Sequence, residues 1–261
     1  MRVSTFLLAL ALGLRALPAA ADPVRPEMTR IPGGSYLPQF AHGPGSVRVG
    51  SFALDRLPVT RGEYLGFVAA HPAWRRDRVS RAVAGDGYLA SWPSATSAGS
   101  ARELRLPATG VSWRAARAYC AWRGKRLPTT DEWEYAALAS EHSRDASRDP
   151  AFTARLLRLY TSRAARPVGS TFRNVYGVWD LHGLVWEWTL DFDEGTAAHA
   201  SHGAHAGAGR GRALSCAAGS LDATDPANYP AFLRYGFRSA LTGRTTTEGL
   251  GFRCAQDLQG S

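Results

Sequence analysis

The sequence has few of the features that mark several common protein classes. Lys125 is its only lysine, and the other basic residues are arginines scattered along the chain. Because no basic run of the kind used by nucleic-acid-binding arms is present, we expect no nucleic-acid partner. No apolar stretch after residue 21 is long enough to cross a bilayer. The chain also lacks a Ser/Pro-rich linker and an internal repeat, and its length fits one large domain or two small ones.

The first 21 residues have the features of an export signal. Arg2 precedes an apolar segment at residues 6–14, and small residues at positions 19–21 have the form of a signal peptidase site. The single Arg2 favours ordinary secretion over twin-arginine export, and Arg15 leaves an uncleaved membrane anchor as the alternative. We expect residues 1–21 to be a signal peptide and the protein to be periplasmic or secreted. The formal net charge of +9 favours an acidic partner.

Cysteine is scarce, with residues only at Cys120, Cys216 and Cys254. In an exported protein, three cysteines predict one disulfide bond and one remaining thiol. The 27 glycines and 15 prolines indicate a fold that is rich in loops and turns.

A short strand that ends in a Pro-Gly-Gly turn is expected within residues 28–36, a second strand at residues 47–54, and a short buried strand at residues 249–255. Three helices are expected from their N-terminal caps. Thr60 with Glu63, and Thr129 with Glu132, have the spacing of a capping box, and Ser112 is the predicted cap of the helix between them. One further short helix is expected at residues 151–159.

Residues 174–188 are the most informative stretch, because they place three tryptophans and two glycines around Asp180 and Glu187. Buried carboxylates need partners. The two could accept hydrogen bonds from Trp N–H, Arg or backbone donors, or they could bind Ca²⁺ together with carbonyls of the turn between them. The spacing alone favours the first interpretation. Arg253 is expected to need an acidic or aromatic partner.

Three histidines recur at every third residue, at His199, His202 and His205. They could surround a zinc or copper ion. The simpler interpretation, which we favour, is a Gly/Ala-rich loop that carries incidental histidines.

Taken together, several motifs resemble the formylglycine-generating enzyme family, the sulfatase-modifying-factor domain. They follow one another in the family's order, and the resemblance covers residues 28–258. The stretches that carry it are residues 57–68, 111–120, 124–136, 174–188 and 251–254. The resemblance implies an α+β fold: one compact domain related to C-type lectins, with mixed helices, short strands and little regular secondary structure.

Several residue roles are implied by the resemblance. Cys120 and Cys254 match a cysteine pair that forms a disulfide bond in some members. A structural Ca²⁺ site is implied, although Leu184 replaces the family's usual asparagine; its ligands would be the side chains of Asp180 and Glu187 and the carbonyls of Gly183 and Val185. The implied substrate-cleft residues are Trp186, Arg238 and Ser239.

The sequence departs from the family at the catalytic thiolates. Active members oxidise a substrate cysteine to formylglycine with O₂, using two neighbouring thiolates that hold Cu(I). If Cys216 is the first thiolate, Leu221 occupies the position of the second. If residues 212–215 are instead the equivalent of the family's Arg-Gly-Gly-Ser stretch, both thiolates are missing. Neither alignment retains a cysteine pair, so we expect no copper site of that kind.

We therefore expect an exported accessory or maturation factor that binds another exported protein or peptide, similar to family members that assist nitrite reduction. The alternative is an active O₂-dependent, metal-dependent oxidase that converts a protein cysteine to formylglycine, in which Cys216 shares a metal with one of the three histidines. A lectin-like binder is a third hypothesis, because fold does not fix function.

Overall fold

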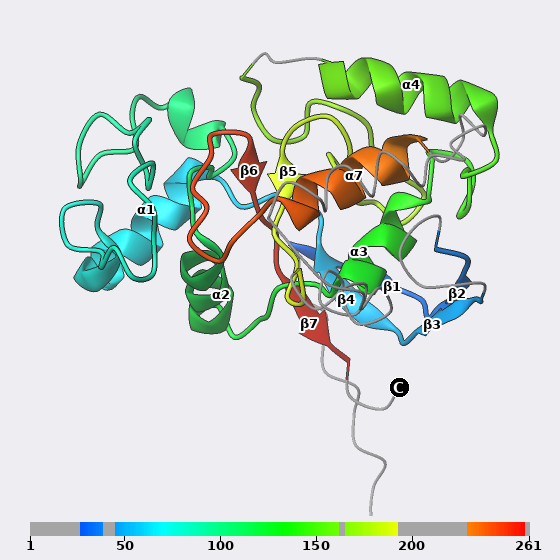
Figure 1. Ribbon diagram of the computed structural model, residues 1–261, viewed down its shortest axis with the longest axis horizontal. Coiled ribbons are helices and arrows are strands. Elements are labelled where there is room, and N and C mark those ends of the chain that lie inside the picture. The colour runs from blue at the N-terminus through cyan, green and yellow to red at the C-terminus, as the bar shows by residue number, and fades with distance from the viewer. Residues whose placement is uncertain (1–26, 39–44, 162–164, 193–228, 259–261) are drawn as a thin grey trace, which may run out of the picture.

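The computed structural model describes residues 27–38, 45–161, 165–192 and 229–258, and these form a mixed α+β domain of short strands and separate helices (Figure 1). The expected signal peptide, Cys216 and the three spaced histidines lie outside the described residues. Within the described residues, no helix is long and apolar enough to cross a membrane.

The N-terminal strands form two small antiparallel sheets. β1 (Met28–Ile31) pairs with β4 (Phe52–Asp55), which also pairs with β7 (Ala255–Asp257). β2 (Gly34–Tyr36) pairs with β3 (Val47–Val49). The C-terminal β7 thus joins the first part of the chain.

The structure corrects the strands expected at residues 28–36 and 47–54. The first ends at the expected turn but is followed by an unexpected strand, β2, and the second is divided into β3 and β4. The break in the first falls at Pro32 and Gly33, where the chain passes from one sheet to the other. A Cβ at Gly33 would lie 2.9 Å from the backbone nitrogen of Ser51, so only glycine allows the two chain segments to cross so closely.

The three helices predicted from their caps begin where expected. α1 (Arg61–Ala70) and α3 (Thr130–Ala137) each start with a complete capping box, and Ser112 caps α2 (Trp113–Trp122). Each cap satisfies backbone N–H groups that have no partner inside the helix. Two single 3₁₀ turns, at Pro72–Trp74 and Glu103–Arg105, interrupt the long irregular segments.

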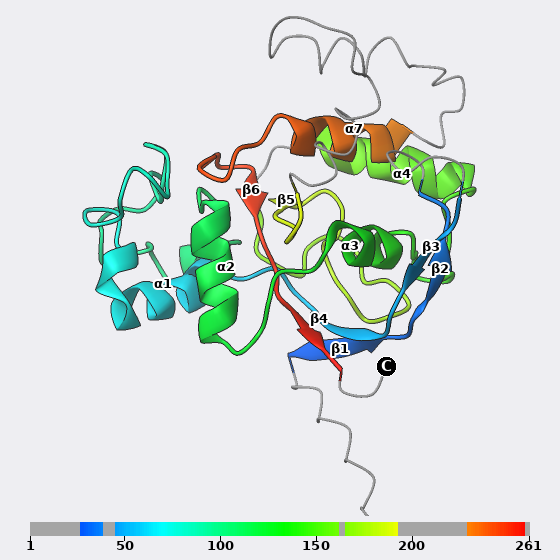
Figure 2. The same cartoon turned by 60° about the horizontal axis from the view of Figure 1, so that its bottom comes forward.

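Two further helices lie side by side over one face of the domain (Figures 1 and 2). α4 (Pro150–Thr161) extends slightly beyond the helix expected at residues 151–159. α7 (Tyr229–Ser239) was not expected from the sequence. Near them, β5 (Trp186–Glu187) pairs in parallel with β6 (Leu250–Gly251). The strand expected at residues 249–255 is therefore split between β6 and the start of β7.

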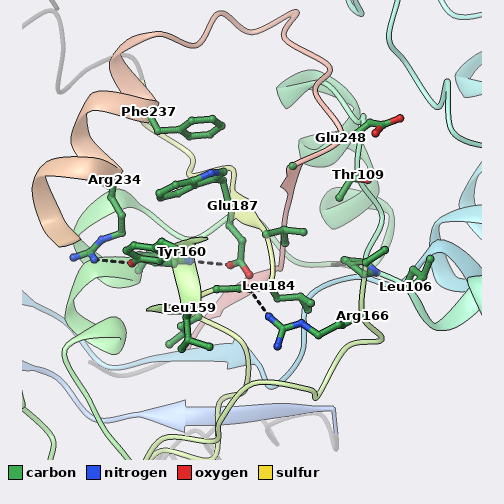
Figure 3. A pocket seen from close by; sticks show the side chains of 18 of the residues that line it. Leu106, Thr109, Leu159, Tyr160, Arg166, Leu184, Glu187, Arg234, Phe237 and Glu248 are labelled. Carbon is green, nitrogen blue, oxygen red and sulfur yellow. Dashed lines mark hydrogen bonds between the residues drawn. The ribbon is translucent and has the colours of Figure 1, made fainter. Parts of the chain in front are cut away.

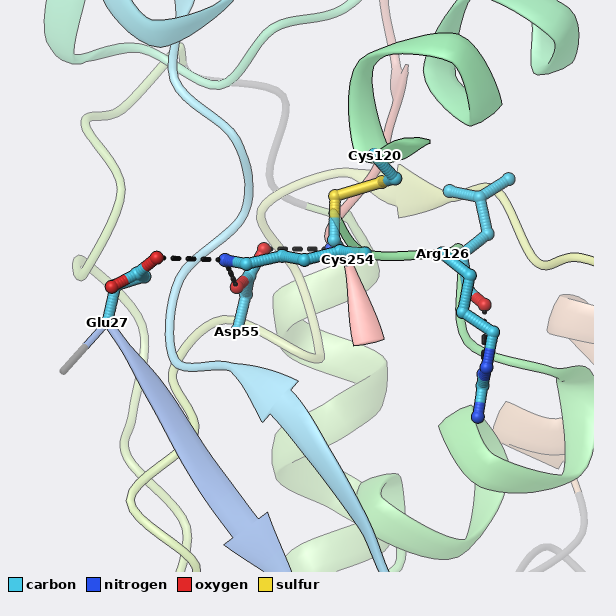
Figure 4. The surroundings of a disulfide bond; sticks show 7 residues. Glu27, Asp55, Cys120, Arg126 and Cys254 are labelled. Carbon is cyan, nitrogen blue, oxygen red and sulfur yellow. Dashed lines mark hydrogen bonds and ion pairs between the residues drawn. A yellow bond between two sulfur atoms is a disulfide. The ribbon is translucent and has the colours of Figure 1, made fainter. Parts of the chain in front are cut away.

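A disulfide bond between Cys120 and Cys254 links α2 to the segment before β7 (Figure 4). Both cysteines are fully buried among aromatic side chains of the main core, including Tyr64 and Tyr119. Asp55 supports this junction, since its carboxylate accepts a hydrogen bond from the backbone N–H of Cys254 at 2.9 Å. The bond joins chain segments 134 residues apart.

Candidate binding cleft

A cavity of about 530 Å³ opens between α4, α7 and β5, and we call it the cleft (Figure 3). Its volume lies within the usual range for ligand pockets. The residues that line it include Arg61, Leu106, Trp133, Tyr160, Arg166, Gly183, Leu184, Trp186, Glu187, Arg234, Phe237, Arg238 and Glu248.

One wall of the cleft is aromatic. The indole of Trp186 stacks on Phe237 of α7, with ring centroids 4.7 Å apart and planes inclined by 18°. Its ring centroid lies 5.3 Å from that of Tyr160 of α4. Such a row of rings offers a flat apolar surface to a ligand. It is assembled from three elements that are far apart in the sequence.

The floor of the cleft holds a fully buried ion pair. Arg253 donates to both carboxylate oxygens of Glu187 at 2.8 Å, and neither side chain is exposed. Trp133 Nε1 donates to the same carboxylate at 2.8 Å. The remaining donors of Arg253 reach the carbonyl oxygens of Asp55 and Trp179. Arg253 thus has the acidic partner that the sequence led us to expect.

Asp180 is also buried and fully engaged by protein donors. It accepts hydrogen bonds from the backbone N–H of Gly169 and from both the N–H and the hydroxyl of Thr171, the latter two at 2.8 Å. Its φ of 61° is in the left-handed region, which aspartate tolerates better than most residues. The carboxylate therefore matches the hydrogen-bonded interpretation of residues 174–188.

The Ca²⁺ site implied for Asp180, Gly183, Val185 and Glu187 does not fit this arrangement of donors. Both carboxylates already accept hydrogen bonds from protein groups, and the carbonyl of Gly183 accepts one from Arg166 at 2.8 Å. A calcium ion at Glu187 would also lie beside the guanidinium group of Arg253, so binding there would require this ion pair to rearrange. Among the described residues, no group of three or more His, Cys, Asp or Glu side chains is placed to hold a metal. The calcium site stays a prediction.

A second buried charge network attaches α7 to α3. Glu134 accepts hydrogen bonds from Arg234 and Arg238 of α7, each at 2.6 Å in its shortest contact. Burial would raise the pKa of the Glu134 carboxyl, but the two guanidinium groups outweigh it and lower the pKa to about 2. Both guanidinium groups also lie over the ring of Trp133, at 5.7 and 5.1 Å from its centroid.

A hydrogen-bond chain runs from this network to the interior. Arg234 donates to the hydroxyl of Tyr160, which lies 2.8 Å from Nδ1 of His182. His182 Nε2 lies 2.8 Å from the carbonyl oxygen of Ala137. A carbonyl can only accept, so Nε2 carries the proton and Nδ1 accepts from Tyr160. Burial, with a smaller contribution from Arg234, lowers the pKa of His182 to about 3.

The structure brings together some of the residues that the sequence suggested. Trp186 and Arg238 both line the cleft. Ser239 does not line it, and its hydroxyl donates a hydrogen bond to the carbonyl oxygen of Gly236. Cys216 lies outside the described residues. Sequence reasoning missed other lining residues, above all Arg61 and Arg166. They lie far apart in the sequence. Arg61 falls within the motif at residues 57–68, which suggested no role for its side chain, and Arg166 belongs to no motif.

Comparison with known proteins identifies the family. Residues 15–258 match the family model of the sulfatase-modifying factor enzyme 1-like domain. The chain belongs to this family. It is 30% identical over 277 residues to a Mus musculus protein named inactive C-alpha-formylglycine-generating enzyme 2, covering 88% of this chain and 85% of that protein. It is also 30% identical over 298 residues to the formylglycine-generating enzyme of Streptomyces coelicolor, covering 92% of this chain and 94% of that protein.

Two solved structures are also similar to this family member. PvdO from Pseudomonas aeruginosa is 19% identical, with a TM-score of 0.49, covering 93% of this chain and all of that one. CarF is 16% identical, with a TM-score of 0.49, covering 90% of this chain and 98% of that one. The relative named inactive and the relative named formylglycine-generating enzyme are each 30% identical to this chain, so membership of the family alone does not fix the activity.

Proposed function

We propose that this protein is an exported accessory or maturation factor that binds a segment of another exported polypeptide in the cleft, without oxidising a cysteine in it. The observation that carries the proposal is that two of the three cysteines form a disulfide bond, which leaves one thiol. Of the three in the sequence, Cys120 and Cys254 are joined to each other, and Cys216 is the third. One thiolate cannot supply the two sulfur ligands of a Cu(I) centre.

The cleft supports the binding part of the proposal. Its stacked rings at Trp186 and Phe237 present apolar surface, and binding pockets are typically apolar with a few placed polar groups. Phe237 belongs to α7, and this helix is attached to α3 by the ion pairs of Arg234 and Arg238 with Glu134. Such a wall is already formed before a ligand arrives, which lowers the entropic cost of binding.

A photo-cross-linking side chain at Leu184, which lines the cleft, tests this function in exporting cells. We expect adducts with one exported polypeptide, unchanged in a Cys216→Ser background. The matched control carries the same side chain at Val175, which is 41% exposed and outside the cleft. The same adducts from both positions, or none from position 184, would show that the cleft holds no such partner.

The second candidate function is an active metal-dependent oxidase that forms formylglycine on a protein cysteine. The similarity to the Streptomyces coelicolor enzyme favours it. It requires ligands other than a cysteine pair of this chain, and Cys216 with one of His199, His202 or His205 would be the candidates. It predicts metal in the purified protein and loss of that metal in Cys216→Ser, which the accessory function does not.

A further inference from the structure

Two arginines of the cleft carry positive charge that no described carboxylate offsets by direct contact. Arg61 Nη2 donates to the hydroxyl of Ser91 at 3.1 Å, and Arg166 Nη2 donates to the carbonyl of Gly183 at 2.8 Å. Both acceptors are uncharged. The Nε of each guanidinium is buried and has no acceptor within the part of the chain that the structure describes. Each group has five N–H donors, so most of its capacity is unused.

Backbone hydrogen bonds place both arginines on one side of the cleft, which we call the Leu106 wall. The N–H of Arg61 donates to the carbonyl of Leu106 at 2.8 Å, and the N–H of Val168, two residues after Arg166, donates to the carbonyl of Arg105 at 3.0 Å. Figure 3 shows Arg166 and Leu106 on the same side of the cavity, across from Tyr160. The Leu106 wall is therefore cationic and faces the aromatic wall.

The nearby carboxylates do not neutralise this wall. Glu248 is exposed at the rim, and its carboxylate points away from Arg166 (Figure 3). Glu103 bonds instead to the N–H and hydroxyl of Ser100, both at 2.8 Å. Those bonds are the main cause of the lowered pKa of Glu103, and the charge of Arg61 is a smaller one. A ligand can supply the missing carboxylate.

We propose that Arg61 and Arg166 form a subsite for a carboxylate of the polypeptide bound in the cleft, with a neighbouring apolar or aromatic side chain of that polypeptide against Trp186 and Phe237. This rests on the proposed binding function and names the chemistry of the ligand. Guanidinium–carboxylate hydrogen bonds are charge-assisted and are stronger than those between neutral groups. The carboxylate belongs to an Asp or Glu side chain or to the C-terminus of the bound chain.

The donor set suits a carboxylate better than a phosphate. Phosphate sites usually combine cationic side chains with free backbone N–H groups at a helix N-terminus. At the start of α1, the N–H of Arg61 is bound to Leu106, and the N–H of Glu63 is bound to the hydroxyl of Thr60. Two side chains with spare donors remain, which matches the needs of a planar carboxylate.

Calorimetric titration of the purified full-length protein with short peptides tests the subsite. Acetyl-Phe-Glu-amide is compared with acetyl-Phe-Gln-amide, which has the same shape without the charge. We expect the Glu peptide to bind at least about tenfold more tightly, as hydrogen bonds to charged groups allow. Acetyl-Gly-Phe with a free C-terminus tests the other source of carboxylate. The proposal would be overturned if the Glu peptide and the Gln peptide bind with equal affinity and acetyl-Gly-Phe binds no more tightly than the uncharged Gln peptide.

Substitutions assign the discrimination to the two arginines. Arg61→Gln and Arg166→Gln should each reduce the ratio of the Glu-peptide to Gln-peptide affinities toward one, and Arg166→Lys should retain part of it. Arg114→Gln removes an exposed arginine outside the cleft and should leave the ratio unchanged. Thermal unfolding of each variant confirms that it is folded. An unchanged ratio in both cleft Gln variants, or stronger competition by inorganic phosphate than by acetate, would contradict the subsite.

The two proposals fail in different ways. If cross-linking from Leu184 persists while the Glu and Gln peptides bind equally, the cleft binds a polypeptide but the carboxylate subsite is wrong. If the peptides are distinguished and the discrimination depends on Arg61 and Arg166, but no exported polypeptide cross-links, the subsite stands and the accessory function is wrong.

Discussion

The floor of the cleft and its Leu106 wall use arginine in opposite ways. At the floor, every nitrogen of Arg253 donates to an acceptor, and the opposing Glu187 is equally satisfied. On the wall, Arg61 and Arg166 each use one guanidinium nitrogen, and within the described residues they meet only neutral acceptors. A guanidinium with all its partners inside the chain serves the fold, whereas one with spare donors beside a cavity is available to a ligand. The comparison thus distinguishes an arginine that stabilises the fold, Arg253, from two arginines that are available to bind a ligand, Arg61 and Arg166.

Removing the ion pair between Arg253 and Glu187 at the floor of the cleft should have the largest effect on stability. Arg253→Leu leaves the Glu187 carboxylate buried without its cation, and we expect the free energy of unfolding to fall by about 3–5 kcal/mol. Urea denaturation measures it. The control is Asp77→Asn, which removes a partly exposed pair with Arg75 and should cost at most about 1 kcal/mol. Similar losses in the two variants would contradict the structural role of the floor pair.

Removing the disulfide bond should have the next largest effect. The double substitution Cys120→Ala with Cys254→Ala frees segments 134 residues apart, and we expect a loss of about 2–5 kcal/mol. The denatured wild-type protein should show one reactive thiol without reductant and three with it. Three reactive thiols without reductant would show that Cys120 and Cys254 are not bonded to each other. It would then no longer follow that this chain has no pair of thiolates for copper.

The histidine beneath the aromatic wall predicts a dependence of stability on pH. The pKa of His182 is lowered from 6.5 to about 3 in the folded protein, so below pH 6.5 the unfolded chain binds a proton that the folded chain excludes. The free energy of unfolding should therefore fall as the pH decreases from about 6.5 to 4.5, by at most about 1.4 kcal/mol per pH unit from this residue. The slope should be smaller in His182→Gln. An identical slope in that variant would exclude His182 as its cause.

The smallest effect is expected at Ser239, which the family resemblance placed beside the cleft. Among the residues that the structure describes, its hydroxyl bonds to the carbonyl of Gly236 within α7, and it does not line the cavity. Ser239→Ala should change the free energy of unfolding by less than about 1 kcal/mol and leave peptide affinities unchanged. A loss of affinity comparable to that of Arg166→Gln would show that the cleft extends further along α7 than the described lining.

Local signals in the sequence predicted the local parts of the fold. Thr60, Ser112 and Thr129 cap helices as expected, since a cap depends only on residues a few positions away. The sequence indicated a turn at Pro32 to Gly34, but it predicted neither β2 after that turn nor the break between β3 and β4. That break lies at Ser51, where the chain passes close to Gly33 from a distant part of the sequence. Helix α7 was missed, although its attachment through Glu134 explains why it docks where it does.

The site was predictable only in part, for the same reason. The buried environment of Glu187 and the need of Arg253 for a partner could be inferred from residue types, but their pairing across 66 positions could not. The Leu106 wall gave no signal, because Arg61 and Arg166 acquire their role only when the fold brings both segments against residues 105–106.

The central claim is that the cleft binds a polypeptide on a scaffold that has lost the two-thiolate copper centre. The most direct test incubates the purified protein with Cu(I), O₂ and a Cys-X-Pro-X-Arg peptide, beside a copper-loaded formylglycine-generating enzyme, and measures the aldehyde by mass spectrometry. We predict aldehyde only with the control enzyme. Copper-dependent conversion of the peptide by this protein, over many turnovers, would contradict the account.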